Sequence, residues 1–242
     1  MIIRRLRAPL ALAALASMLA TSTALASAPS DVTLPVPHRT QADGSVWAGS
    51  NCGPAAIGMV LEAYGVKVPN GALRNRANQL LGIADPNTGT RVQDLARIVQ
   101  EHGLSVTGPF EGNRFKRWTL EEVRAELESG RPLVIQVYYP LLPNHRKNPI
   151  ATDHYVLLVG LSGDGFIFND SADRDNPGFR QKITADELTK AWRASQYPFA
   201  GFSVGSGNKG QPLLPSSSDA NDVGVSILIE ELSALRSQTK AG

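Results

Sequence analysis

The chain contains a single cysteine, Cys52, whose neighbours suit nucleophilic chemistry. A cysteine attacks as its thiolate, so its free pKa of about 8.5 has to be lowered for reaction near neutral pH. The positive end of a helix dipole lowers it. The segment Asn51-Cys52-Gly53-Pro54 predicts a helix start, because Pro54 suits a first turn in which its missing N–H loses no partner. Backbone N–H groups there can also stabilise the oxyanion of an acyl transfer.

An adjacent imidazolium is the second device that lowers the pKa of a thiol, and the chain has four histidines. His38 lies in an N-terminal leader, His102 at a helix C-terminus and His145 in a polar loop. His154 begins an apolar, β-branched segment, so its ring can face a cleft while the strand behind it is anchored. We therefore predict His154 as the base.

A predicted hairpin behind His154 ends in Asn169-Asp170, and a carboxylate there could orient the imidazole. Counting across the short loop places Leu157 opposite Asp170 and Leu158 opposite Asn169. On a flat ladder His154 then shares its face with Asn169 rather than Asp170. Twist, or a bulge at the strand end, would exchange the two. Asp170 is the first choice for the orienting residue, and Asn169 stays as the second.

The elements that must position these residues can be read from hydrophobic periodicity and capping signals. Three capping boxes are predicted, beginning at Thr90, Thr119 and Thr184. Predicted helices cover 51–65, 71–81, 90–103, 119–130 and 184–192, and predicted strands cover 104–107, 133–139, 154–161, 166–169 and 199–204. Helices come first and antiparallel strands afterwards, which indicates an α+β fold.

The N-terminus has the layout of a cleaved secretory signal over residues 1–26. Three arginines within residues 4–7 precede an apolar run over 8–20, and Ala24-Leu25-Ala26 ends in small residues. The apolar run is about 13 residues long, whereas a membrane-spanning helix needs about 20. We expect a secreted protein, extracellular or in the cell envelope, with no stable membrane insertion after cleavage. An uncleaved anchor is the alternative.

The charge of the chain argues against a nucleic-acid partner, and its cysteine content excludes an internal disulfide. The chain has 24 basic and 22 acidic residues, and removal of the three signal arginines changes the formal charge from +2 to −1. Without a run of Lys and Arg, nucleic acid is not an expected partner. A lone cysteine permits no internal disulfide. We predict one domain over 27–204, followed by a linker and short tail over 205–242, and the sequence carries no signal for an oligomeric state.

Four segments, in this order, resemble the C39-like peptidase family, a bacterial branch of the papain-like cysteine peptidases. They are Gln41-Ala42-Asp43-Gly44-Ser45-Val46-Trp47, Asn51-Cys52-Gly53-Pro54-Ala55-Ala56, His154-Tyr155-Val156-Leu157-Leu158-Val159-Gly160 and Phe168-Asn169-Asp170-Ser171-Ala172. The resemblance implies a papain-like fold, in which N-terminal helices, with the nucleophile at the start of a central helix, pack on a C-terminal antiparallel sheet. The family often has Asp-Pro where this chain has Asp170-Ser171.

The resemblance also implies the roles of the site residues. Cys52 would be the nucleophile, His154 the general base and then acid, and Asp170 the orienting residue. Gln41 would donate its side-chain amide to the oxyanion, beside the backbone N–H of Cys52. Gln93 and Gln136 have no such context.

Three hypotheses for function follow. The first is a cysteine peptidase that hydrolyses peptide or related amide bonds of a peptide or protein substrate through an acyl-enzyme. The second keeps this intermediate but passes the acyl group to an amine, as an acyltransferase or transglutaminase-like enzyme does. The third is a papain-like binding module in which Cys52 is an inert core residue. No cofactor or metal is expected, because one Cys and four scattered His show no ligand spacing. The polar loop 140–152 is our candidate for a specificity element beside the cleft.

Overall fold

The structure is a computed structural model that describes residues 31–146, 150–172 and 178–215. The predicted signal peptide, residues 1–26, lies outside the described residues, as does the tail from residue 216 onward. In the described part no helix is both long enough and apolar enough to cross a membrane.

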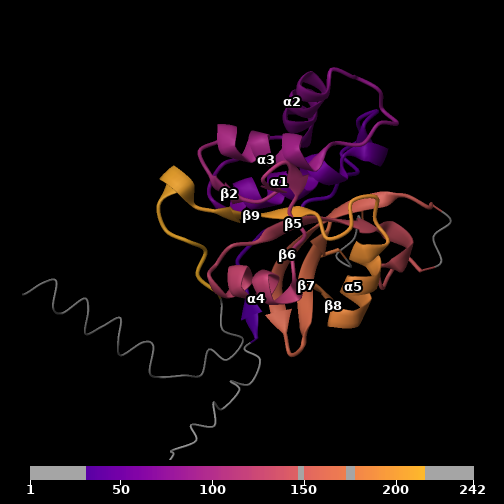
Figure 1. Ribbon diagram of the computed structural model, residues 1–242. Coiled ribbons are helices and arrows are strands. Elements are labelled where there is room, and N and C mark those ends of the chain that lie inside the picture. Colours follow the sequence, from indigo (N-terminus) through magenta and orange to yellow (C-terminus); the bar gives the residue numbers. More distant parts are fainter. Residues whose placement is uncertain (1–30, 147–149, 173–177, 216–242) are drawn as a thin grey trace, which may run out of the picture.

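The fold consists of helices and an antiparallel sheet whose strand order differs from the order in the sequence (Figure 1). The helices are α1 (Cys52–Ala63), α2 (Asn70–Leu81), α3 (Val92–Glu101), α4 (Leu120–Glu128) and α5 (Ala185–Arg193). The strands are β1 (Val32–Thr33), β2 (Ser105–Thr107), β3 (Phe110–Glu111), β4 (Arg114–Phe115), β5 (Leu133–Tyr138), β6 (Asp153–Ser162), β7 (Gly165–Asp170), β8 (Gln181–Ile183) and β9 (Gly201–Gly205). The predicted α+β class, with helices before the main strands, is confirmed.

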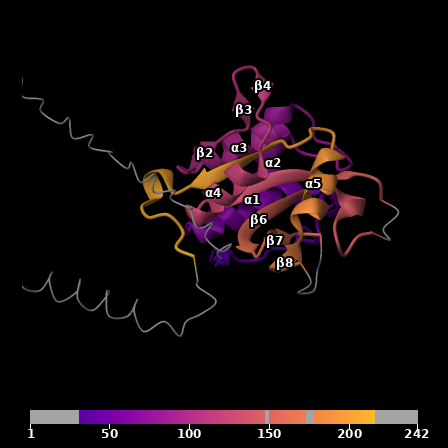
Figure 2. The same cartoon turned by 60° about the horizontal axis from the view of Figure 1, so that its bottom comes forward.

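The main sheet has the strand order β2-β9-β5-β6-β7-β8, with β1 paired to β6 in addition, and β3 and β4 form a separate hairpin. Figure 1 shows α1, α2 and α3 grouped in the upper part of that view, with α4 and α5 lower down, on either side of β7 and β8. Figure 2 shows the hairpin of β3 and β4 projecting from the body of the molecule. The strands β5, β6 and β7 are buried along almost their whole length, so they form the centre of the core.

Helix α1 is central because it has no polar face. Its residues from Gly53 to Leu61 are all buried, and it packs against β6, α2 and α3. A helix that is apolar all round is stable only inside the protein. The start of α1, with Cys52 as its first residue, is thereby fixed against the strand that carries His154.

Two of the three capping boxes predicted from the sequence are present in the structure. Thr119 and Thr184 cap α4 and α5, each with its partner glutamate three residues on. The box predicted at Thr90 is wrong, because α3 begins one residue later, with Arg91 as its N-cap and no side-chain cap. The segment after β9 continues along the domain as far as Leu213, which is buried against Gly130 although it lies in the predicted linker.

The register between β6 and β7 differs from the flat ladder. Leu161 pairs with Phe166 as predicted, but a bulge between Leu158 and Gly160 shifts the rest by one residue. Leu157 therefore lies opposite Asn169, and Val156 lies opposite Asp170, which corrects the predicted pairing. Because alternate residues of a strand share a face, His154 and Val156 lie on the face of Asp170.

Candidate functional site

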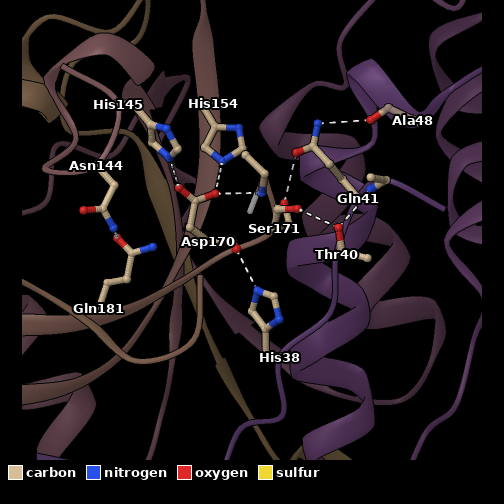
Figure 3. A network of polar contacts seen from close by, with 12 residues as sticks. His38, Thr40, Gln41, Ala48, Asn144, His145, His154, Asp170, Ser171 and Gln181 are labelled. Atoms are coloured by element: carbon tan, nitrogen blue, oxygen red, sulfur yellow. Dashed lines mark hydrogen bonds and ion pairs between the residues drawn. The ribbon is translucent and has the colours of Figure 1, made fainter. Parts of the chain in front are cut away.

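Cys52, His154 and Asp170 meet at one end of the sheet. Cys52 begins α1, His154 is the second residue of β6 and Asp170 is the last residue of β7. The Nε2 atom of His154 lies 2.7 Å from Oδ1 of Asp170, and the Cys52 thiol hydrogen-bonds to the same imidazole. Since Asp170 occupies Nε2, the nitrogen left for Cys52 is Nδ1 (Figure 3).

The second choice for the orienting residue has a different role. The side-chain N–H of Asn169 donates to the carbonyls of Val36 and Pro37, at 3.5 and 3.3 Å, and its Oδ1 accepts from the backbone N–H of Arg180 at 2.9 Å. Asn169 is fully buried and holds the chain segment before Gln41 against β7. Asp170, not Asn169, contacts His154.

The electrostatics of the three groups are coupled. Burial raises the pKa of the Cys52 thiol, but the hydrogen bond and charge of His154, with backbone N–H groups of Tyr155 and Gly53, bring it below its ordinary value. Burial lowers the pKa of His154, yet the charge and hydrogen bond of Asp170, and then Cys52, raise it to about 10. Burial raises the pKa of Asp170, and the two imidazoles that contact it hold that pKa well below its usual range. The arrangement therefore favours a thiolate and imidazolium pair.

Gln41 lies in the same cavity as Cys52 and His154. Its Nε2 donates to the Ala48 carbonyl at 3.1 Å, and its Oε1 accepts from Ser171 Oγ at 3.2 Å. The carbonyl of Ala48 can only accept, so the orientation of the amide is fixed. The second N–H of Nε2 is geometrically separate from this bond and is the one that could reach an oxyanion.

Gly53 permits close packing behind the nucleophile. A Cβ atom at this position would lie 2.2 Å from Thr90 Oγ1 and 2.8 Å from Leu95 Cδ1. Thr90, predicted to cap a helix, instead places its hydroxyl over Gly53, where the hydroxyl has no hydrogen-bond partner among the described residues. Any larger residue than glycine would push α1 and α3 apart at the site.

A buried cation supports the cleft from behind. The Arg74 guanidinium donates to the carbonyls of Ser50 at 3.1 Å, Asp85 at 3.2 Å and Thr88 at 2.6 Å, and the side chain is fully buried. Burial lowers the pKa of Arg74, while the charges of Cys52 and then Asp85 raise it. Arg74 thus joins the segment before the nucleophile to the loop 85–88.

The cleft extends on both sides of the nucleophile. Cys52 lines one cavity of about 290 Å³ together with Gln41 and His154, and a second of about 300 Å³ that includes neither. Thr152, at the end of the predicted specificity loop, lines both cavities. The two cavities thus adjoin at Cys52 and Thr152.

Two further histidines contact Asp170, and the sequence analysis had assigned neither to the site. His145 Nε2 lies 2.8 Å from Oδ2 of Asp170, and His38 Nε2 donates to the Asp170 backbone carbonyl at 2.7 Å. His102, expected to be structural, contacts the Ile98 carbonyl at its helix end. The signal for His145 was its place in the loop expected to border the cleft.

Comparisons with known proteins indicate the family and the fold of the chain. The model of the "Peptidase_C39 like family" matches residues 33–198. A structure described as a C39-like peptidase from Bacillus anthracis is 18% identical, covers 72% of this chain and 96% of its own, and has a TM-score of 0.52. Its likeness indicates the fold alone.

Two other solved structures are also similar. A double glycine motif protease from an AMS/PCAT transporter, solved with a leader peptide, is 21% identical, with coverage of 72% and 94% and a TM-score of 0.46. The peptidase domain of Streptococcus ComA is 14% identical, with coverage of 64% and 90% and a TM-score of 0.39. No relative was found among curated proteins.

Proposed function

Because the chain belongs to the C39-like peptidase family, we propose that it is a cysteine peptidase that cleaves peptide bonds with Cys52, His154 and Asp170. The observation that carries this proposal is the unbroken series of contacts from the Cys52 thiol through the His154 ring to Asp170, opening into a cleft. A lone buried thiol in an inert module would not require an imidazolium and a buried carboxylate behind it.

The reaction follows from these positions. The Cys52 thiolate attacks the substrate carbonyl carbon, and the oxyanion accepts hydrogen bonds from the Gln41 side chain and the Cys52 backbone N–H. The C–N bond then breaks, and Nδ1 of His154 gives its proton to the leaving amine. Water adds to the acyl-enzyme with His154 as base, which releases the acid and restores the thiolate. Asp170 keeps the imidazole in one orientation throughout.

The cleft assigns the two halves of the substrate to its two cavities. The leaving amine has to reach His154 and the oxyanion has to reach Gln41, and both residues line the first cavity. The second cavity beside Cys52, lined by Thr90 and Tyr155, would then take the rest of the acyl part. The peptide or protein substrate would lie extended across both.

Alkylation at pH 6 tests the proposal. A free thiol with a pKa of about 8.5 is only about 0.3% thiolate at this pH, whereas the Cys52 thiolate is stabilised by His154. We expect iodoacetamide to modify Cys52 faster than a free thiol, and His154→Ala to remove the difference. Cleavage of a peptide library should be lost in Cys52→Ala. Reaction no faster than a free thiol, with no cleavage by the wild-type protein, would leave the binding-module hypothesis, and cleavage retained in Cys52→Ala would refute Cys52 as the nucleophile.

We also propose that the chain is exported, on the signal-like pattern of residues 1–26. A mature protein that begins at Ser27 would support this proposal, and an intact N-terminus in the cell would contradict it. The acyl-transfer alternative is separated from hydrolysis by the products formed with and without an added amine.

A further inference from the structure

Both carboxylate oxygens of Asp170 are held by imidazoles. His154 Nε2 lies 2.7 Å from Oδ1, and His145 Nε2 lies 2.8 Å from Oδ2. Oδ1 also accepts the backbone N–H of Ala172 at 2.8 Å. Figure 3 shows the rings of His145 and His154 next to each other, each directed at a different oxygen of the Asp170 carboxylate.

The His145 ring is itself held in place. It stacks on Tyr139 with the ring centroids 4.1 Å apart and an interplanar angle of 24°. Tyr139 also makes an edge-on contact with His154, with the ring centroids 5.0 Å apart and an interplanar angle of 62°. His145 is 6% exposed and its backbone N–H donates to the Leu142 carbonyl at 3.0 Å. One aromatic ring therefore orients both imidazoles relative to each other.

A carboxylate that is bonded through one oxygen can still rotate about its Cβ–Cγ bond. Asp170 is 0% exposed, so Oδ2 does not face bulk solvent, and among the described residues the donor that faces Oδ2 is His145. A buried acceptor left without a donor is strongly disfavoured. Without His145, the carboxyl group would turn, or take up a proton, and its hold on His154 would weaken.

A shared metal ion does not account for this cluster. Imidazole nitrogens and carboxylate oxygens lie about 2.0–2.2 Å from a bound zinc, whereas these nitrogens lie at hydrogen-bond distance from the oxygens themselves. Among residues 31–146, 150–172 and 178–215, no group of three His, Cys, Asp or Glu side chains is arranged to hold a metal.

We propose that His145 is a positioning residue for the reaction: its Nε2–H holds Oδ2 of Asp170, so that Oδ1 faces His154 and the imidazole stays aligned with Cys52. The proposal rests on the proposed function, because it assigns His145 a part in the work of the same three residues. It ties the loop segment 140–146 to the catalytic group, and Ile150 and Thr152 of the same loop line the cavity beside Cys52.

Three variants of His145 distinguish the effect of its hydrogen bond to Asp170 from the effect of its ring packing on Tyr139. His145→Gln keeps a donor near the position of Nε2 but has no ring, His145→Asn keeps an amide that is too short to reach Oδ2, and His145→Phe keeps the stack on Tyr139 without a donor. We expect His145→Asn and His145→Phe to lower kcat by about 10- to 100-fold, by analogy with the loss of the hydrogen-bond partners that orient metal-binding histidines. KM should change little, and His145→Gln should stay within about threefold of wild type.

The relative activities of the three variants test the proposal. Wild-type activity in His145→Phe with loss in His145→Gln would mean that ring packing matters and would overturn the proposal. Activity within threefold of wild type in all three, or a rise in KM at unchanged kcat, would overturn it as well. If His145→Phe does not fold, as judged by circular dichroism, the Asn and Gln variants still give the comparison.

A second measurement reports on the alignment of His154 with Cys52. The rate of Cys52 alkylation against pH should shift to higher pH in His145→Asn and remain near wild type in His145→Gln. A purely structural role would leave this profile unchanged. Cleavage that persists in Cys52→Ala would refute the proposed function whatever His145 does, whereas an inactive Cys52→Ala with a fully active His145→Asn would refute this inference alone.

Discussion

The coupling between Cys52 and His154 makes the pH dependence of stability a test of their charge states. The pKa of His154 is about 10 in the folded protein and about 6.5 when unfolded. Its stabilisation is therefore complete below pH 6.5 and is lost as the pH rises toward 10. The folded pKa of Cys52 is lowered, so its contribution is present above the unfolded value of about 8.5 and is lost as the pH falls.

These two contributions cancel between pH 6.5 and 8.5. As a thiolate–imidazolium pair, the folded residues hold one proton in that window, on His154, and the unfolded residues also hold one, on the thiol of Cys52. The pair then adds no slope to the free energy of unfolding. In Cys52→Ala the thiol proton is gone, but Asp170, whose charge and hydrogen bond are the first causes that raise the pKa of His154, remains, so we expect His154 to keep its proton. The folded state then binds one proton more than the unfolded state.

One extra proton corresponds to a slope of about −1.4 kcal/mol per pH unit. Relative to wild type, Cys52→Ala should lose about 2 kcal/mol of unfolding free energy between pH 7.0 and 8.5. Urea unfolding at several pH values in this range measures the difference, because contributions of other groups are common to both proteins and the m-value should not change.

The matched control is Cys52→Ala combined with Asp170→Asn, which removes the anion that raises the pKa of His154. Its slope should return to that of wild type. Equal slopes for Cys52→Ala and wild type would refute the reasoning, because they would mean that folded His154 carries no proton above pH 7.

Two substitutions behind the site should reduce stability. In Arg74→Met, three carbonyls lose a charged donor worth about 1.5–3 kcal/mol each, while the cost of burying the guanidinium, several kcal/mol, disappears. We expect a net loss of about 2–4 kcal/mol and a Tm lower by about 5–15 °C in calorimetry, and an unchanged Tm would contradict this account. Gly53→Ala should cost about 1–3 kcal/mol in urea unfolding, because its Cβ overlaps Thr90 Oγ1. Gly71→Ala, also in the first turn of a helix but with no atom within 4 Å of the new Cβ, should cost nothing, and equal effects at both sites would argue against the overlap.

The features that the sequence predicted correctly are those that depend on neighbours in the chain. The capping boxes at Thr119 and Thr184 bring together residues three apart, and the apolar run after Cys52 needs only to be buried. At Thr90 the prediction was wrong because α3 begins one residue later, and the Thr90 hydroxyl packs against Gly53 instead of capping the helix. His145 was missed for a related reason, since its contact with Asp170 spans 25 residues and depends on where the loop returns.

The choice between Asp170 and Asn169 depended on one bulge, and the sequence did contain a signal for it. A glycine inside a strand often marks a bulge or a close backbone approach. Gly160 is such a glycine: it follows the bulge, and an added Cβ would lie 2.1 Å from the carbonyl oxygen of Val32 in β1. Strand β1 was not predicted, because two residues have no readable periodicity. The glycine, more than the count across the hairpin loop, could have indicated that Asp170 faces His154.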